Sequence, residues 1–398
     1  MRDLSNFYRD LRVSHGARIA EETERLHTLF DEGIYKWLAS LWDGRAGGFY
    51  YSISARDNMG FYPDMESTAQ ALNSLESFGI LKNEEVPLRM QKKMVAFMQA
   101  KQHEDDGYFY HAQWGKDVST SRRARDLSHA LSIFSRFGGA PLYKTALERI
   151  GEAAADGKTE TEGSTVPEHL RSAAAFREYL EGLGINEQSY SVGHRIGAQA
   201  AQIAAAGLTD VCIDFLNSTQ KSNGFWEDVL NHSSSNGMMK ISCAYVSLGA
   251  PIPNVMTSFD SALEVLLSDL PYSAITEVFN PPFSLLNFLE ILERTGDREN
   301  LVKAKELLLS RGADIIRVAY ERLIPFKKPD GSFSYCKSCS SHWSQGKPVC
   351  IKDSFESDVN ANSLANGSRV RSLKIFGIEP PKIFDADDAR LFYELCGE

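Results

Sequence analysis

One pattern recurs six times along this chain: apolar residues at helical spacing run directly into a glycine. Apolar residues three and four positions apart form one face of a helix, and glycine readily adopts the left-handed conformation that ends a helix. The pattern therefore predicts six helices, each closed by a glycine cap. The capping glycines are Gly79, Gly138, Gly207, Gly249, Gly296 and Gly377.

A second pattern lies between these helices, and it places aromatic residues directly after a glycine. It reads GGFYYS at Gly48, DGYFYH at Gly107, NGFWED at Gly224 and DGSFSY at Gly331. The first interval is 59 residues, and the later ones are nearly twice as long, as expected if some units have lost the turn. A unit of roughly 55 to 60 residues holds one pair of helices with its connections.

Six helical pairs in sequence predict an all-α fold, an (α/α)6 toroid in which about six hairpins form a closed ring. An open solenoid is the structural alternative, and the count of six favours closure. We expect residues 1–398 to form a single domain. Within it, residues 1–30 would be a peripheral N-terminal helical segment and residues 379–398 a C-terminal tail.

Composition narrows the classes of partner. The chain has 398 residues, 43% of them hydrophobic, which is enough to bury a large core. Its net charge of −10 opposes the attraction that supplies most nonspecific nucleic-acid affinity, so we expect no nucleic-acid partner. The N-terminus lacks the apolar core of a signal peptide, and no stretch is apolar for long enough to form a transmembrane segment. We therefore expect a soluble, cytoplasmic protein.

The segment from Gly47 to Leu72 resembles the catalytic region of class II terpene cyclases of the squalene-hopene type. In that family a GGW-type turn and a tyrosine-proline segment precede the acidic motif DxDD, which is followed by Thr-Ala. Here the motif reads Asp64, Met65, Glu66, Ser67. The resemblance implies that Glu66, in the place of the middle aspartate, is the acid that protonates the substrate, with Asp64 as its partner.

The same superfamily carries an aromatic repeat of the form F-L-x3-Q-x3-G-x-W. Residues 215–226 fit this QW-like repeat, and residues 97–109 repeat it with one extra residue. In the family the glutamine ties a helix end to the turn, and the aromatic ring packs between hairpins. The resemblance covers most of the chain and implies the toroid fold of terpenoid cyclases and protein prenyltransferases.

Polar residues precede the expected inner helices, where a toroid normally meets its substrate. Asp64, Asp126, Asn280 and Asp358 are each explained by helix capping. Capping does not require the arginines near Asp126, and Asn360 lies close to Asp358 in sequence. We therefore assign five residues to substrate binding: Arg122, Arg125, Asp126, Asp358 and Asn360. The fourth expected helix follows Lys240, and the fifth follows Asn280 and a Pro-Pro pair.

A further cluster, QSYSVGHRIGAQ, places Tyr190 and His194 four residues apart and next to Arg195. If helical, Tyr190 and His194 share one face, and histidine is well suited to proton transfer near neutral pH. This grouping resembles the one in toroid-fold polysaccharide lyases, where arginine neutralises a uronate carboxylate and tyrosine or histidine moves protons. The alternative is a buried histidine beside an ion-paired arginine.

Aromatic residues and histidine gather in the turns. Their faces suit either a carbocation or a sugar ring, and core packing accounts for many of them. The candidate substrate contacts among them are Tyr51, Tyr110, His111, Trp114 and Trp226.

Four possible metal ligands are close in sequence near the C-terminus: Cys336, Cys339, His342 and Cys350. Thiolates and imidazole are zinc ligands, but the spacing is not that of a standard finger. We predict no metal and no cofactor, with zinc at these four residues as the alternative.

Two enzymatic hypotheses follow from these residues. The first is a terpene-cyclase-like enzyme, an isomerase or lyase, that cyclises or isomerises an unsaturated isoprenoid-type substrate by acid initiation at Glu66. The alternative is a carbohydrate-active toroid, a uronate polysaccharide lyase or a glycoside hydrolase, that uses Tyr190, His194 and Arg195. A binding toroid without catalysis is a third possibility.

Overall fold

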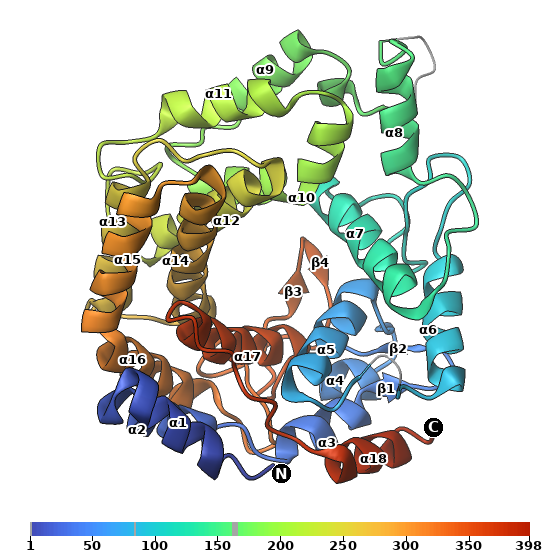
Figure 1. Cartoon of the computed structure of the whole chain (residues 1–398). Helices are drawn as coiled ribbons and strands as arrows, with labels where there is room; N and C mark the ends of the chain where they lie inside the picture. The colour runs from blue at the N-terminus through green and yellow to red at the C-terminus, as the bar shows by residue number, and fades with distance from the viewer. Residues whose placement is uncertain (1, 83–84, 161–165) are drawn as a thin grey trace.

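The computed structural model describes residues 2–82, 85–160 and 166–398, and these residues form a mostly helical protein (Figure 1). The strands among them are two short antiparallel hairpins, β1 (Trp42–Asp43) with β2 (Gly48–Phe49) and β3 (Trp343–Ser344) with β4 (Lys347–Pro348). The predicted all-α class is confirmed. None of the described helices is both long enough and apolar enough to cross a membrane.

Six helices surround the centre of the molecule (Figure 1). Each one contacts the next along the chain, and the last contacts the first, so their contacts form a closed circuit. These inner helices are α5 (Met65–Phe78), α7 (Thr120–Phe137), α10 (Ser189–Ala205), α12 (His232–Leu248), α14 (Thr276–Thr295) and α17 (Val359–Lys374).

The remaining helices lie outside this circuit (Figure 1). Residues 2–30 contain α1 and α2, which pack on each other, and α2 packs on α16; residues 379–398 contain α18, which packs on α3. The outer elements are α1 (Ser5–His15), α2 (Ala17–His27), α3 (Gly33–Ser40), α4 (Ile53–Asp57), α6 (Leu88–Gln99), α8 (Ala146–Ala155), α9 (Ala173–Glu181), α11 (Thr209–Thr219), α13 (Val255–Leu267), α15 (Arg298–Ser310), α16 (Gly312–Leu323) and α18 (Ala386–Leu395), with 3-10 turns at Glu168–Leu170 and Ile324–Phe326.

The predicted helix ends are confirmed. All six glycines that end the apolar patterns have a positive φ, between 70° and 96°. This left-handed conformation is available to glycine without the steric cost that other residues incur.

Two predicted helix starts are wrong. Lys240 lies inside α12, and Asn280, Pro281 and Pro282 lie inside α14. Proline removes a backbone N–H and normally breaks a helix interior. Here both prolines follow the first turn of α14 closely and are buried in the protein, so packing offsets the lost hydrogen bonds.

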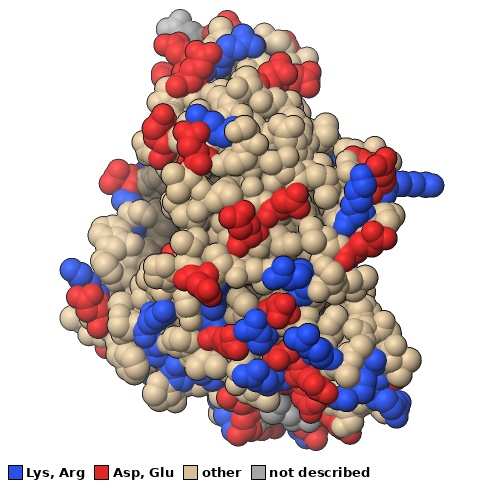
Figure 2. Space-filling model, turned by 90° about the vertical axis from the view of Figure 1, so that its left-hand side faces the viewer, with Lys and Arg blue, Asp and Glu red and all other residues tan. Residues whose placement is uncertain are grey.

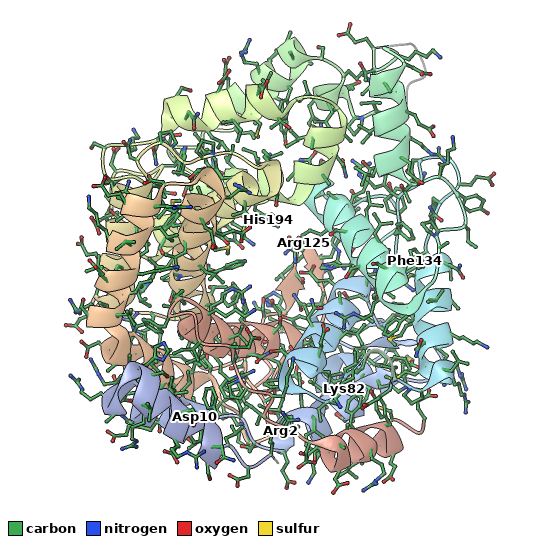
Figure 3. All side chains as sticks on the ribbon, in the orientation of Figure 1. Arg2, Asp10, Lys82, Arg125, Phe134 and His194 are labelled. Atoms are coloured by element: carbon green, nitrogen blue, oxygen red, sulfur yellow. The ribbon has the colours of Figure 1, made fainter. Side chains whose placement is uncertain are left out.

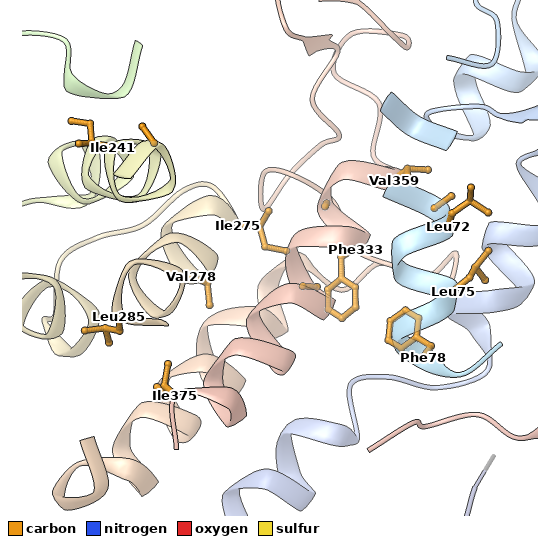
Figure 4. Close-up of a cluster of buried hydrophobic side chains, with 14 of the residues drawn as sticks. Leu72, Leu75, Phe78, Ile241, Ile275, Val278, Leu285, Phe333, Val359 and Ile375 are labelled. Carbon is orange, nitrogen blue, oxygen red and sulfur yellow. The ribbon is translucent and has the colours of Figure 1, made fainter. Parts of the chain in front are cut away.

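The core continues between neighbouring inner helices. Figure 4 shows Leu72 and Phe78 of α5 near Phe333 and Val359 on one side of α17, and Val278 and Leu285 of α14 on its other side. All these side chains are buried, so the circuit is held by apolar packing on the sides of the helices that face away from the central cavity.

Two glutamines, Gln102 and Gln220, each join the end of an outer helix to a later segment of chain. Gln220 donates to the carbonyl of Gly224 at 2.9 Å and accepts from the backbone N–H of Asn254 at 3.4 Å. Gln102 donates to the carbonyl of Tyr143 at 2.8 Å and accepts two backbone N–H groups there. Both side chains thus fix the connection between consecutive hairpins.

Gly107 provides a test of this packing. Its φ is +72°, and a Cβ built there would lie 2.3 Å from the carbonyl oxygen of Lys144. We expect Gly107→Ala to lower the free energy of unfolding by about 1–3 kcal/mol, measured by urea denaturation. The control is Gly151→Ala in α8, where a Cβ meets nothing within 4 Å, and which should raise stability by about 0.5–1 kcal/mol. Equal effects at the two sites would contradict the expectation.

Candidate functional site

A cavity of about 460 Å³ lies at the centre of the circuit. Each inner helix contributes one face to it, with residues spaced by three, four and seven positions as the helical repeat requires. Among the polar and charged side chains that line it are Glu66 of α5, Arg125 and His129 of α7, Tyr190 and His194 of α10, Lys240 and Cys243 of α12, Asn280 of α14, Arg371 of α17 and the loop residue Tyr335.

The N-terminus of α5 brings two carboxylates to one wall of the cavity. Asp64 is the N-cap of α5 and accepts hydrogen bonds from the backbone N–H and the hydroxyl of Ser67, at 2.9 and 2.6 Å. Its neighbour Glu66 faces the cavity and forms an ion pair with Arg125. The predicted capping role of Asp64 is confirmed.

A buried arginine holds this wall together. Arg122 is 0% exposed and contacts three carboxylates: Asp126 at 2.9 Å, Asp64 at 3.4 Å and Glu66 at 3.7 Å. Its guanidinium also lies 4.5 Å from the ring centroid of Trp114. Removing this one cation would leave Asp64 and Asp126 without their ion-pair partner, whereas Glu66 would keep Arg125.

The two arginines determine the protonation of the acids. Burial opposes ionisation of Glu66, but Arg125 and Arg122 outweigh it and lower the pKa of Glu66 to about 2. At Asp126 burial prevails over Arg122 and raises the pKa to about 7. Glu66 is therefore a fixed anion at neutral pH, which does not suit a proton donor.

The adjoining wall, formed by α10 and α12, carries neutral groups beside a cation. The rings of Tyr190 and His194 are stacked, with centroids 6.2 Å apart, and the Lys240 ammonium lies 5.7 Å from the Tyr190 ring centroid. Burial, with Lys240 and Arg125 nearby, lowers the pKa of His194 to about 3. Burial also lowers the pKa of Lys240 to about 8. Figure 3 shows Arg125 and His194 at the edge of the central space.

The cavity has an excess of positive charge. Neither Lys240 nor Arg371 forms an ion pair with a described residue, and Glu66 is the one acidic side chain among the described residues of the lining. Arg371 lies 3.8 Å from the ring centroid of Phe283. By contrast, acidic and basic side chains intermingle on the outer face in Figure 2. The charge of the lining thus favours an anion over a cation in this cavity.

The β3–β4 hairpin contributes a loop to the same wall. The Ser344 carbonyl accepts from Arg122 at 3.4 Å, and its hydroxyl donates to Glu66 at 3.5 Å. The next residue, Gln345, lines the cavity. This loop connects the C-terminal third of the chain to the carboxylates of α5.

Comparison with protein-family models, with curated proteins and with solved structures finds no match for this chain. The geometry of the site is therefore the basis for any functional conclusion.

The cavity brings together five of the residues predicted from the sequence: Glu66, Arg125, Tyr190, His194 and Asn360. Arg195 is exposed and does not belong to the lining, because it projects from the other side of α10. Asp64, Arg122 and Asp126 lie behind the lining in the ion-pair cluster.

The predicted aromatic contacts support the wall or the core. Trp114 packs edge-on against His111, whose Nε2 accepts the Met65 N–H at 3.1 Å. The Tyr51 hydroxyl donates to Asp358 at 3.0 Å. Burial raises the pKa of Asp358 to about 7, although the hydrogen bonds that its carboxylate accepts act to lower it. Asp358 is also the N-cap of α17. The other two are Tyr110, which donates to Asp106, and Trp226, which is buried and donates to Leu216.

The four possible zinc ligands are not gathered into a metal site. Among the residues that the structure describes, no three histidine, cysteine, aspartate or glutamate side chains are placed to hold a metal ion. Cys350 instead lies 3.6 Å from the Ser340 hydroxyl, and Cys336 contacts Cys339 through the backbone.

Several lining residues escaped prediction, notably Arg371, Tyr335 and Gln345. Arg371 lies near the C-terminal end of α17, whereas the prediction considered helix starts. The available signal was the spacing of Asn360, Ser363, Gly367 and Arg371 on one helical face. Tyr335 closes the DGSFSY turn, so the aromatic-turn pattern could have indicated it, whereas no comparable signal exists for Gln345.

The neutral state of His129 predicts sensitivity to acid. Burial and the nearby Arg125 lower its pKa to about 4. An unfolded histidine binds a proton near pH 6.5, so His129 costs stability as the pH falls from about 6.5 to about 4. Over that range we expect the free energy of unfolding to fall by roughly 1–3 kcal/mol more than in His129→Gln, measured by urea denaturation. The exposed His103→Gln is the control, and parallel profiles for wild type and His129→Gln would contradict this.

Proposed function

We propose that the chain is an (α/α)6 toroid enzyme whose central cavity binds an acidic sugar of the uronate type. The closed circuit of six inner helices, with outer helices around it, supports the toroid. The observation that carries the substrate class is the pair of unpaired cations, Lys240 and Arg371, in a cavity with one acidic side chain that is itself neutralised. A carboxylate bound there would complete the missing ion pairs.

Proton-transfer groups lie beside these cations. Burial raises the pKa of Tyr190, so its hydroxyl stays protonated and can donate. His194 is neutral and can accept a proton, and its pKa is lowered by burial, by Lys240 and by Arg125. A bound carboxylate would offset the two cations, raise the pKa of His194 and so make it a stronger base when substrate is present.

This arrangement suits β-elimination. His194 would take the proton on the carbon next to the uronate carboxylate, and the electrons of that C–H bond would form a carbon–carbon double bond as the adjacent C–O bond breaks. Tyr190 would give its proton to the leaving oxygen. The carboxylate, held by Lys240, would stabilise the negative charge that develops in the transition state.

Acid-initiated cyclisation of an isoprenoid has less support from the site. It needs a protonated acid at Glu66, and the pKa of this residue is lowered to about 2 because two arginines outweigh burial. It also needs a mainly apolar cavity, whereas polar and charged side chains occur on all six inner helices.

A ligand screen by thermal shift tests the proposal. Oligosaccharides of glucuronate or galacturonate should raise the melting temperature, whereas matched neutral oligosaccharides should not. Lys240→Met should weaken uronate binding by about tenfold or more, since a charge-assisted hydrogen bond is lost. Lys305→Met, at an exposed position of α15, is the control. Stabilisation by prenyl diphosphates or squalene-like lipids, with none by uronates, would favour the cyclase instead.

A further inference from the structure

A second pocket, of about 540 Å³, lies beside α6. It shares no lining residue with the central cavity. Between the two spaces lies the N-terminus of α5, where His111 accepts the Met65 N–H and where Arg122 joins the buried carboxylates. The pocket has no part in the chemistry proposed above.

The walls of this pocket are mostly apolar. Tyr62 and Pro63 come from the segment before α5, and Ala96, Phe97 and Ala100 come from α6 and its end. Ala96 and Ala100 are exposed, so the pocket opens to solvent along α6. Small and aromatic side chains in this arrangement leave room for an apolar body.

Its charged residues are all cationic. Arg45, Lys93 and Lys101 line the pocket, and no described lining residue is acidic. Lys93 is already paired with Glu398, and Arg45 is exposed. Lys101 differs from Lys93 because its ammonium reaches no carboxylate among the described residues, and from Arg45 because it is partly buried.

Lys101 has an unsatisfied charge in apolar surroundings. Its Nζ lies 3.2 Å from the ring centroid of Phe97 and donates to the Phe97 carbonyl at 3.2 Å. Burial lowers its pKa to about 8, against the pull of Asp64 and Asp126 behind it. An ammonium held by one carbonyl and one ring retains donors for an anionic ligand.

We infer that this pocket binds a free aliphatic carboxylate. The carboxylate would pair with Lys101, and the chain would lie against Phe97, Tyr62 and Pro63. Charge complementarity selects an anion over a cation, and the apolar walls select an alkyl chain over a small inorganic ion.

Isothermal titration of the full chain with decanoate, decanol and decyltrimethylammonium tests the inference. Decanoate should bind with saturation at one site, and decanol should bind at least tenfold more weakly. Lys101→Met should weaken decanoate binding by tenfold or more, and Lys92→Met, at an exposed position of α6, should not. Ala96→Trp should reduce binding by filling the pocket without removing a charge.

Circular dichroism and melting temperature verify that each variant is folded. Uronate binding in the central cavity should persist in Ala96→Trp, and decanoate binding should persist in Lys240→Met, so the two proposals can fail separately. Absence of decanoate binding, equal binding of decanoate and decanol, or undiminished binding in both Lys101→Met and Ala96→Trp would overturn the inference.

Discussion

Replacing Arg122 by methionine is expected to lower the free energy of unfolding by about 3–5 kcal/mol. This is the usual cost of removing one partner of a buried ion pair, because the other charge stays buried without compensation. Arg122 is fully buried and is the cation that Asp64 and Asp126 share. Without it both carboxylates must be buried unpaired or protonated. Urea denaturation at neutral pH measures the loss.

The matched control is Arg177→Met, at an exposed position of α9, which should change stability by less than about 0.5 kcal/mol. The deficit of Arg122→Met should shrink as the pH falls, because buried carboxylates without the cation have raised pKa values and accept protons on folding. Adding Asp64→Asn and Asp126→Asn should recover part of the loss. A deficit that is equal at all pH values would show that lost packing on Trp114, rather than charge, dominates.

Tyr190→Phe and His194→Gln are each expected to lower turnover of a uronate oligosaccharide by about 10²–10⁴-fold, the usual contribution of a positioned acid or base. Both side chains line the cavity and are stacked on each other. Formation of the unsaturated product, followed by its ultraviolet absorbance, measures turnover. Substrate binding should be nearly unchanged, because the cations that hold the carboxylate remain.

Arg195→Ala distinguishes the structural assignment from the sequence-based one. Arg195 is adjacent to His194 in sequence but exposed in the fold, so we expect its replacement to leave turnover within about twofold, as for other surface changes. A loss of turnover as large as that of His194→Gln would instead support the sequence-based prediction that Arg195 acts together with Tyr190 and His194. Full activity of Tyr190→Phe and His194→Gln would reject their role in proton transfer.

The sequence predicts helix ends better than helix starts in this protein. A glycine such as Gly138 ends a helix through its own backbone conformation, which is a local property. The Pro281–Pro282 pair is also a local signal, but burial within α14 overrides it. Local rules therefore succeed where no tertiary contact opposes them.

The candidate site shows the same division between local and tertiary information. Helical spacing correctly places Tyr190 and His194 on one face. The protonation of Glu66 depends instead on Arg125, 59 residues away in sequence, and on the burial of both side chains. Sequence could indicate which helices carry polar faces, but not which charges those faces leave unpaired.

Contact between α17 and α5 has a consequence for folding kinetics. The two inner helices that it joins are separated by 280 residues, from 79 to 358, and the Val359 N–H donates to the Tyr51 carbonyl at 2.9 Å across this junction. Contacts of such high sequence separation are entropically costly and form late. During synthesis, α5 through α14 can emerge and pack before α17 exists. Ligand binding in the central cavity should therefore lag behind the recovery of helical structure during refolding.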